Sequence, residues 1–260
     1  MDLIDTHSHI YQEDYNNDIA DVISSAKKHG ISRIFLPNID VETIPALLNL
    51  ADKFPDFCIP MMGLHPTSVK EDFLTQLRLI EKELNNRDYT SIGEIGIDLY
   101  WDKSHLSEQK EALRIQIQWA IERELPIVIH VRDSFRETMN VIQEFSEQSL
   151  SGVFHSFCGT KEDAAEILKL ENFFFGINGI VTFKNSDLGN VLKDVLLSRI
   201  VLETDSPYLT PTPHRGKRNH PDYLHLIANK LSEVYQRPVE EIAAITTENA
   251  KKLFKKAYSE

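Results

Sequence analysis

Short apolar runs alternate with longer amphipathic segments from one end of the chain to the other. A run rich in β-branched residues and bounded by turn residues is typical of a strand, and a run that is apolar throughout is typical of a strand buried on both faces. The runs predict eight strands, at Leu3–Thr6, Ile31–Leu36, Cys58–Gly63, Thr90–Ile95, Pro126–His130, Gly152–His155, Phe173–Ile177 and Arg199–Glu203.

The segments between these runs carry apolar residues at helical spacing. Ile19, Val22, Ile23 and Ala26 form one such stripe, and Gly30 follows where a helix commonly ends. No linker rich in Pro, Gly or Ser and no block of like charge interrupts the alternation. We therefore predict a single domain over residues 1–260 that folds as a closed parallel (β/α)8 barrel, or TIM barrel, with a doubly wound open sheet as the alternative.

Composition places the chain among globular proteins of a reducing compartment. Of the 260 residues, 42% are hydrophobic and 26% charged, which is enough apolar material for one barrel core. Cys58 and Cys158 are far apart in the sequence, so we expect neither a disulfide framework nor a cysteine-based metal site. The first residues lack the regions of a signal peptide, and no apolar run is long enough to span a membrane. We expect a cytoplasmic protein without membrane association.

Histidines and carboxylates follow most of the predicted strands. His7 and His9 follow the first, and because residues two apart in an extended chain point to the same side, both imidazoles can face one ion. A lone histidine of this kind is more commonly a buried core residue or a helix cap. Several at a barrel mouth, where the carboxyl ends of the strands converge, would bury many charges together unless a metal compensated them. The residues concerned are His7, His9, His65, Glu94, Asp98, His130, His155, Glu203 and Asp205.

This set of side chains favours a particular kind of metal site. Imidazole and carboxylate without thiolate suit Zn, Mn or Mg rather than a soft metal or an iron–sulfur cluster. One tetrahedral ion cannot use so many ligands, whereas two divalent ions about 3.5–4 Å apart, bridged by a carboxylate, can use them and can lower the pKa of a bridging water to near 7. Glu94 is the candidate bridge, because it comes from the middle of the set and its strand end offers no lysine.

The motifs that carry these residues resemble those of the TatD-type metal-dependent DNases of the amidohydrolase superfamily. The resemblance covers nearly the whole chain and rests on motifs in a specific order: DTHSH at 5–9, GLHP at 63–66, GEIGID at 93–98, HVRD at 130–133, HSF at 155–157, GIVTFKN at 179–185, ETDSPYLTP at 203–211 and HRGKRNHP at 214–221. It implies a barrel and the hydrolysis of DNA phosphodiester bonds, with 3′–5′ exonuclease, abasic-site or endonuclease action.

The resemblance also implies roles for individual residues. One metal ion would be held by His7, His9, Glu94 and Asp205, and a second by Glu94, His130 and His155. Glu94 and Asp205 would take part in catalysis, Asp205 by managing the proton of the attacking water. A substrate phosphate would contact His65 and Arg132, and the ligands would be oriented by Asp98 and Glu203.

A basic segment after the last predicted strand sets an expectation about the substrate. Arg215 and Arg218 leave from the barrel mouth, so we expect both to contact a nucleic-acid backbone. The net charge of −12, from 28 Lys and Arg against 40 Asp and Glu, disfavours polyanions but omits about +4 from two bound divalent ions. We expect a monomeric enzyme that engages DNA ends, single strands or damaged sites rather than wrapping a duplex.

Two other functions fit a barrel of this kind, because the fold does not fix the substrate. One is an amidohydrolase acting on a small phosphotriester, lactone or amide. In many relatives of those classes a carboxylated lysine bridges the metals, and the glutamate at position 94 argues against them. The other is a non-catalytic protein that binds metal or nucleic acid with a decayed site, and the complete ligand set argues against decay.

Overall fold

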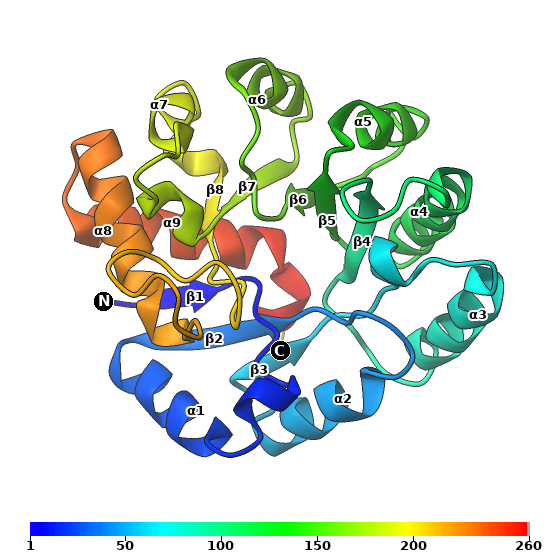
Figure 1. Ribbon diagram of the computed structural model, residues 1–260, viewed down its shortest axis with the longest axis horizontal. Coiled ribbons are helices and arrows are strands. Elements are labelled where there is room, and N and C mark those ends of the chain that lie inside the picture. Colours follow the sequence, from blue (N-terminus) through cyan, green and yellow to red (C-terminus); the bar gives the residue numbers. More distant parts are fainter. Residues whose placement is uncertain (259–260) are drawn as a thin grey trace.

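The apolar runs of the sequence form the strands of one parallel barrel in the computed structural model, which describes residues 1–258 (Figure 1). Hydrogen-bonded ladders join the strands in chain order within two groups, β1 to β3 and β4 to β8, and every ladder is parallel. The strands are β1 (Leu3–Asp5), β2 (Ile31–Leu36), β3 (Cys58–Pro60), β4 (Ile92–Asp98), β5 (Ile127–Arg132), β6 (Gly152–Phe154), β7 (Phe173–Ile177) and β8 (Ile200–Leu202).

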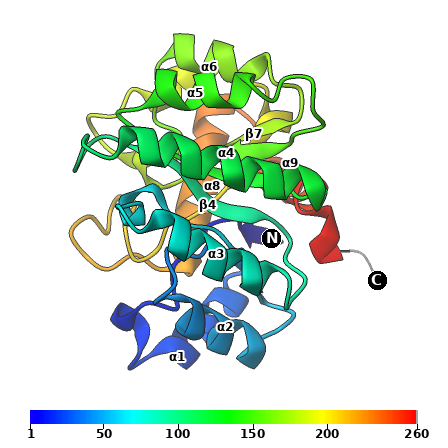
Figure 2. The ribbon, with the colours of Figure 1, turned by 90° about the vertical axis from the view of Figure 1, so that its right-hand side faces the viewer.

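All the helices except the last cover the outside of the barrel in chain order (Figure 1), and neighbours such as α3 and α4 pack against each other in the outer layer (Figure 2). Their apolar stripes face the strands, as the sequence predicts. The helices are α1 (Ile19–Lys28), α2 (Ile44–Lys53), α3 (Phe73–Leu84), α4 (Leu106–Glu122), α5 (Phe135–Gln143), α6 (Lys161–Leu168), α7 (Leu188–Leu192), α8 (Leu224–Tyr235) and α9 (Val239–Leu253).

The two groups of strands meet at both edges, so the sheet is closed. Met62 forms a parallel bridge with Ile92 between β3 and β4. On the other side the backbone N–H and the hydroxyl of Thr6 both donate to the carbonyl oxygen of Leu202, at 3.0 and 2.9 Å, and join β1 to β8. The predicted closed barrel is therefore confirmed, and the open doubly wound sheet is wrong.

Several strand ends differ from the prediction, and the pairing explains why. β4 and β5 continue beyond the predicted ends because their ladder extends to Asp98 opposite Arg132. β3 ends at Pro60 rather than Gly63, because after Met61 the chain leaves β2 and bonds to the strand on its other side, with Gly93 donating to the carbonyl oxygen of Met62 at 3.0 Å. These local changes set where the side chains of the mouth point.

Two helix ends follow ordinary capping rules. Gly30 follows α1 with a φ of +81°, and a Cβ atom there would lie 2.1 Å from the carbonyl oxygen of Met1, so only glycine fits. Thr160 and Asp163 form a capping box at the start of α6.

Cys58 and Cys158 are both free thiols, as expected. Within residues 1–258, the longest and most apolar helices still fall short of what a membrane crossing needs.

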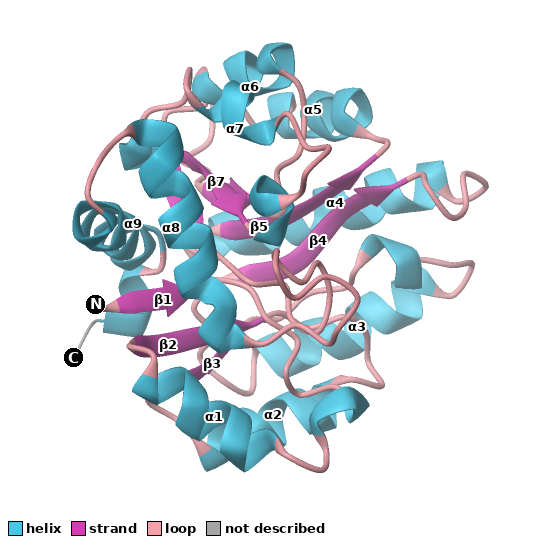
Figure 3. Ribbon diagram, turned by 60° about the vertical axis from the view of Figure 1, so that its left-hand side comes forward, coloured by secondary structure: helices cyan, strands magenta, loops and turns pink. Residues whose placement is uncertain are grey.

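The amino end of the barrel is closed by α9, which lies beside the N-terminus (Figure 3). Asn249 donates to the carbonyl oxygens of Leu197 and Ile200 at 2.9 and 2.7 Å, just before and at the start of β8. The ring of Phe254 stacks on that of Phe35 inside the barrel, with centroids 4.2 Å apart, and both are fully buried. The carboxyl end of the strands therefore remains as the open mouth.

We expect Phe254→Ala to lower the free energy of unfolding by about 3–5 kcal/mol, because it leaves a cavity under the barrel floor. Urea denaturation followed by far-UV circular dichroism measures the change. Leu196→Ala is the matched control, since Leu196 is 68% exposed and its truncation should change stability by less than about 0.5 kcal/mol. Equal losses in the two variants would contradict a floor formed by α9.

Candidate metal centre

The ionisable residues that follow the strands meet in one pocket of about 620 Å³ at the mouth of the barrel. His7 and Glu203 lie beneath the pocket and are fully buried. The basic residues Arg215 and Arg218 are not among its lining residues. The predicted site residues that line the pocket are His9, His65, Glu94, Asp98, His130, Arg132, His155 and Asp205.

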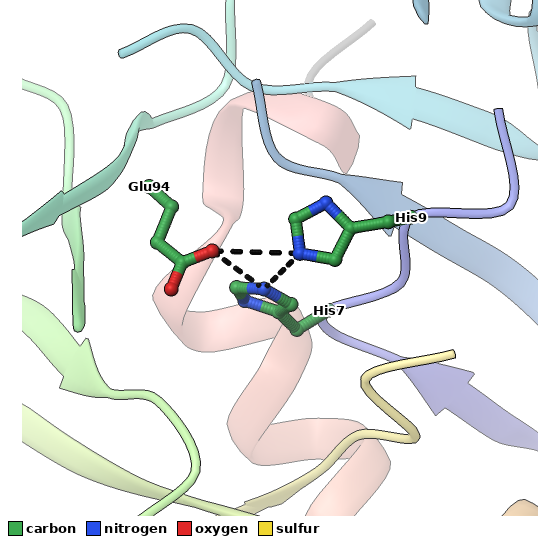
Figure 4. Close-up of side chains that lie close together, drawn as sticks. All are labelled: His7, His9 and Glu94. Atoms are coloured by element: carbon green, nitrogen blue, oxygen red, sulfur yellow. Dashed lines mark hydrogen bonds and ion pairs between the residues drawn. The ribbon is translucent and has the colours of Figure 1, made fainter. Parts of the chain in front are cut away.

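Glu94 lies at the centre of this group, with only 2% of the residue exposed. Its Oε2 atom faces the histidines that follow β1, 3.1 Å from His7 Nε2 and 3.5 Å from His9 Nε2 (Figure 4). Its Oε1 atom faces the opposite side, 2.8 Å from His130 Nδ1 and 3.7 Å from His155 Nε2. The two oxygens of one carboxylate thus address two separate groups of imidazoles.

The local backbone explains how Glu94 reaches this position. The ladder between β4 and β5 shifts its register between Ile92 and Ile95, so Gly93 and Glu94 form an irregularity within the strand. Asn38, in the loop after β2, holds this irregularity on the side away from β5. The backbone N–H of Glu94 donates to the Asn38 carbonyl oxygen at 3.2 Å. A Cβ atom on Gly93 would lie 2.6 Å from the Cβ of Val128, so this approach requires glycine.

The donor atoms are spaced as a metal ion would need them. Ligand atoms about 2.1 Å from a tetrahedral ion lie about 3.4 Å from one another. His7 Nε2 and His9 Nε2 are 3.1 Å apart beside Glu94 Oε2, and two buried ring nitrogens this close to a carboxylate fit a shared cation. Groups of three with suitable spacing are His7, His9 and Glu94; His65, Glu94 and His130; and His7, His155 and Glu203.

The tautomer of His9 follows from its second partner. The hydroxyl of Tyr11 donates to the carbonyl oxygen of Pro37 at 2.6 Å, so it accepts from His9 Nδ1–H, 3.1 Å away. The lone pair of His9 is then on Nε2, the atom that faces Glu94 and His7. In this tautomer Nε2 could accept a metal ion, while Tyr11 fixes the orientation of the ring.

His65 has the opposite arrangement. The backbone N–H of Thr67 donates to His65 Nδ1 at 3.1 Å, so Nδ1 is the acceptor and the neutral ring carries its proton on Nε2. Nε2 lies 3.3 Å from Glu94 Oε1 and 3.3 Å from His130 Nδ1. Burial also lowers the pKa of His65, which keeps the ring neutral. Although His65 has the spacing of a ligand, its Nε2 presents a proton rather than a lone pair to Glu94.

Two carboxylates hold the remaining imidazoles from behind. Asp98 Oδ2 lies 2.9 Å from His130 Nε2, and Glu203 Oε1 lies 2.9 Å from His155 Nδ1. Burial would lower the pKa of each histidine, but the neighbouring carboxylates raise it, for His155 to about 10. Burial likewise opposes ionisation of Glu94, yet the surrounding histidines hold its pKa well below the usual range. These pairs direct the other ring nitrogen of each histidine at Glu94.

Asp205 lies at the boundary between the two groups of imidazoles. Its Oδ1 is 3.8 Å from His7 Nε2 and 3.7 Å from His9 Nε2, and its Oδ2 is 3.9 Å from His155 Nε2. Burial raises its pKa to about 6, although the histidines oppose the shift. Its φ of 57° is uncommon for a residue other than glycine and is typical of functional sites held by their surroundings. Asp205 therefore faces the two groups of imidazoles with one oxygen each.

Asp5 is a structural part of the site that the sequence reasoning missed. It is fully buried and accepts from the backbone N–H and the hydroxyl of Thr204 at 2.8 and 2.6 Å. These bonds fasten the end of β1 to the end of β8, and the N–H of Asp205 donates to the His7 carbonyl oxygen at 2.9 Å beside them. Both residues occur within the DTHSH and ETDSP motifs, but nothing in a single sequence pairs them.

The three predicted phosphate-binding arginines have different surroundings. Arg132 lines the pocket, and no described carboxylate lies within ion-pair distance of it. Arg215 stacks on the ring of Phe183, 3.7 Å from its centroid. Arg218 forms an ion pair with Asp18, which holds the pKa of that carboxyl below its usual value. Only Arg132 therefore offers an uncompensated positive charge to the pocket.

Imidazoles and carboxylates gather at the carboxyl ends of the strands of this closed parallel barrel. The protein is therefore a barrel protein with a candidate divalent-metal centre. The chain belongs to the TatD related DNase family, whose sequence profile matches residues 4–255. The family resemblance of the motifs is therefore confirmed over nearly the whole chain.

Individual relatives agree with this membership. The chain is 39% identical over 254 residues to YabD of Bacillus subtilis, an uncharacterized metal-dependent hydrolase, covering 97% of this chain and 99% of YabD. It is 31% identical over 261 residues to YcfH of Escherichia coli K12, another uncharacterized metal-dependent hydrolase, covering 98% and 96% of the two chains. The crystal structure of YJJV, a TatD homolog of E. coli K12, superposes with a TM-score of 0.90 at 26% identity and covers 97% and 98% of the chains.

We expect Glu94→Gln to abolish stoichiometric metal binding, because the amide cannot supply the charged oxygens that face both groups of imidazoles. Metal content after dialysis, measured by inductively coupled plasma mass spectrometry, reports the loss, and circular dichroism verifies the fold. His65→Gln is the matched variant and should retain its metal, since the His65 tautomer directs a proton at Glu94. Equal metal loss in both variants would make His65 a ligand instead.

Proposed function

We propose that this protein is a metal-dependent deoxyribonuclease that hydrolyses DNA phosphodiester bonds with two divalent metal ions. The observation that carries the proposal is the position of the Glu94 carboxylate. Its two oxygens face different groups of imidazoles. Membership of the TatD related DNase family and the names of the relatives, which are metal-dependent hydrolases, support the reaction class.

Each carboxylate oxygen of Glu94 would bind one of the two ions. Beside Oε2, His7 and His9 would hold the first ion, with Asp205 completing the group from the mouth. Beside Oε1, His130 and His155 would hold the second. Divalent ions held there would supply positive charge for the phosphate and would make a water molecule more acidic. Mg, Mn and Zn all suit imidazole and carboxylate ligands.

The side chains around the ions would perform the remaining steps. The Asp205 carboxylate, which lies between the two groups of imidazoles, would accept a proton from the attacking water at one of its oxygens. His65 Nε2–H would donate to a phosphoryl oxygen, and the guanidinium of Arg132 would balance the phosphate charge. The unpaired Arg132 favours a phosphate substrate over a neutral lactone or amide, because a cation in a pocket is best matched by an anion.

We expect metal-stripped protein to be inactive on labelled single- and double-stranded DNA, and at least one of Mg, Mn and Zn, added back separately, to restore cleavage. Gel electrophoresis of end-labelled oligonucleotides measures the products and distinguishes exonucleolytic from endonucleolytic action. Turnover of a lactone or a phosphotriester without DNA cleavage would favour the small-molecule hydrolase. Metal binding without turnover of any substrate would favour a non-catalytic protein.

We expect Arg132→Gln to raise the KM for DNA and to lower the salt dependence of binding by about one phosphate contact. Arg218→Gln is the comparison, and its effect should be smaller because Asp18 already balances the Arg218 charge. Initial rates at several salt concentrations measure both. A larger effect in Arg218→Gln would mean that its pair with Asp18 opens for the substrate and that the basic segment binds the backbone.

A further inference from the structure

The exposed aromatic side chains of the protein gather beside the candidate metal centre. Within residues 1–258 only Tyr100, Trp101 and Tyr208 are aromatic and exposed, at 53%, 72% and 51%. Trp101 and Tyr208 line the pocket that contains Glu94, Trp101 from the loop after β4 and Tyr208 from the loop after β8. Large aromatic surfaces left in water at the edge of a pocket mark a place where a ligand covers them.

Arg132 organises one side of this edge. Its guanidinium carbon lies 3.7 Å from the ring centroid of Tyr100 and 5.4 Å from that of Trp101. The two rings meet edge to face, with centroids 4.8 Å apart and planes at 89°. Stacking on Tyr100 holds the planar cation in place, while its charge stays free of any described carboxylate. Tyr100, Trp101 and Arg132 are called the aromatic platform below.

Hydrogen bonds connect the aromatic platform to the candidate metal ligands. Asp98 Oδ1 accepts from the backbone N–H of Tyr100 at 3.0 Å, while Asp98 Oδ2 lies 2.9 Å from His130 Nε2. On the far side of Trp101, Asp102 Oδ1 accepts from the backbone N–H and the hydroxyl of Ser104 at 2.8 and 2.6 Å. The Asp102 bonds form a local turn within the loop, and the Asp98 bond ties the start of the loop to the centre.

We propose that the aromatic platform binds one unpaired nucleobase of the substrate next to the phosphate at the candidate metal centre. This inference rests on the proposed deoxyribonuclease function. An aromatic ring and a guanidinium plane together bind a base by stacking, and Arg132 is also placed to contact the adjoining phosphate. In a duplex both faces of each base are already stacked, so the aromatic platform selects DNA ends, single strands and displaced bases.

The test compares two ligands that differ only in the base. Thymidine 5′-monophosphate and 2-deoxyribose 5-phosphate both carry the sugar and phosphate, and neither has a phosphodiester bond that the enzyme could cleave. We expect the metal-loaded protein to bind the nucleotide roughly 5- to 100-fold more tightly by isothermal titration calorimetry, the range that stacking of one base supplies. Trp101 is the exposed one of two tryptophans, the other being Trp119 at 5%, so the nucleotide should also quench fluorescence.

Substitutions test whether the aromatic platform causes the tighter binding of the nucleotide. Trp101→Ala should bring the two affinities together, and Trp101→Phe should keep most of the difference because phenylalanine can still stack. Leu74→Ala removes an exposed apolar side chain on α3, away from the pocket, and should leave the preference unchanged. In cleavage assays, Trp101→Ala should raise the KM for single-stranded DNA more than it lowers kcat.

Equal affinities for the two ligands, or an unchanged preference in Trp101→Ala, would overturn the base site. DNA cleavage without a base preference would overturn this inference and leave the nuclease proposal standing. A base preference that depends on Trp101, found together with an absence of DNA cleavage, would support the base site and reject only the nuclease proposal.

Discussion

An ionised carboxylate inside a barrel must be compensated, and Glu94 imposes this requirement on the whole mouth. With 2% of the residue exposed, it cannot obtain its balancing charge from water. Imidazoles from four different strand ends surround it and hold its pKa well below the usual range in spite of its burial. Divalent ions would satisfy the same requirement more strongly, since each brings two charges into the space between nitrogen and oxygen.

The barrel places its apolar packing at the amino end of the strands and its ionisable residues at the carboxyl end. At the amino end, α9 and the stacked rings of Phe254 and Phe35 fill the interior with apolar side chains. At the carboxyl end, Asp5 and Thr204 close the seam between β1 and β8 with buried hydrogen bonds. Because that seam is fixed, His7 and His9 near one end of the chain lie beside Asp205 towards the other.

Much of this arrangement could be predicted from sequence. The rest depends on hydrogen-bond partners and side-chain orientations, which a single sequence does not specify. The strand pattern predicts the barrel, and parallel strands place their carboxyl ends together, so which residues meet at the mouth follows. The tautomers of His9 and His65 do not follow, because they depend on Tyr11 and Thr67 as hydrogen-bond partners. The ion pair that neutralises Arg218 was equally hidden, because Asp18 lies two hundred positions away.

Local charge, rather than total charge, decides what such a mouth can hold. The chain carries a net charge of −12, which repels a long polyanion approaching its surface. Of its predicted phosphate contacts, Arg218 is paired with Asp18 and Arg215 does not line the pocket, so attraction inside the pocket would come from Arg132 and from bound metal ions. A substrate held at one point needs a second contact that charge does not provide. In the proposed base site, the exposed aromatic surface beside Arg132 would supply that contact without adding charge and would favour a strand end over a duplex.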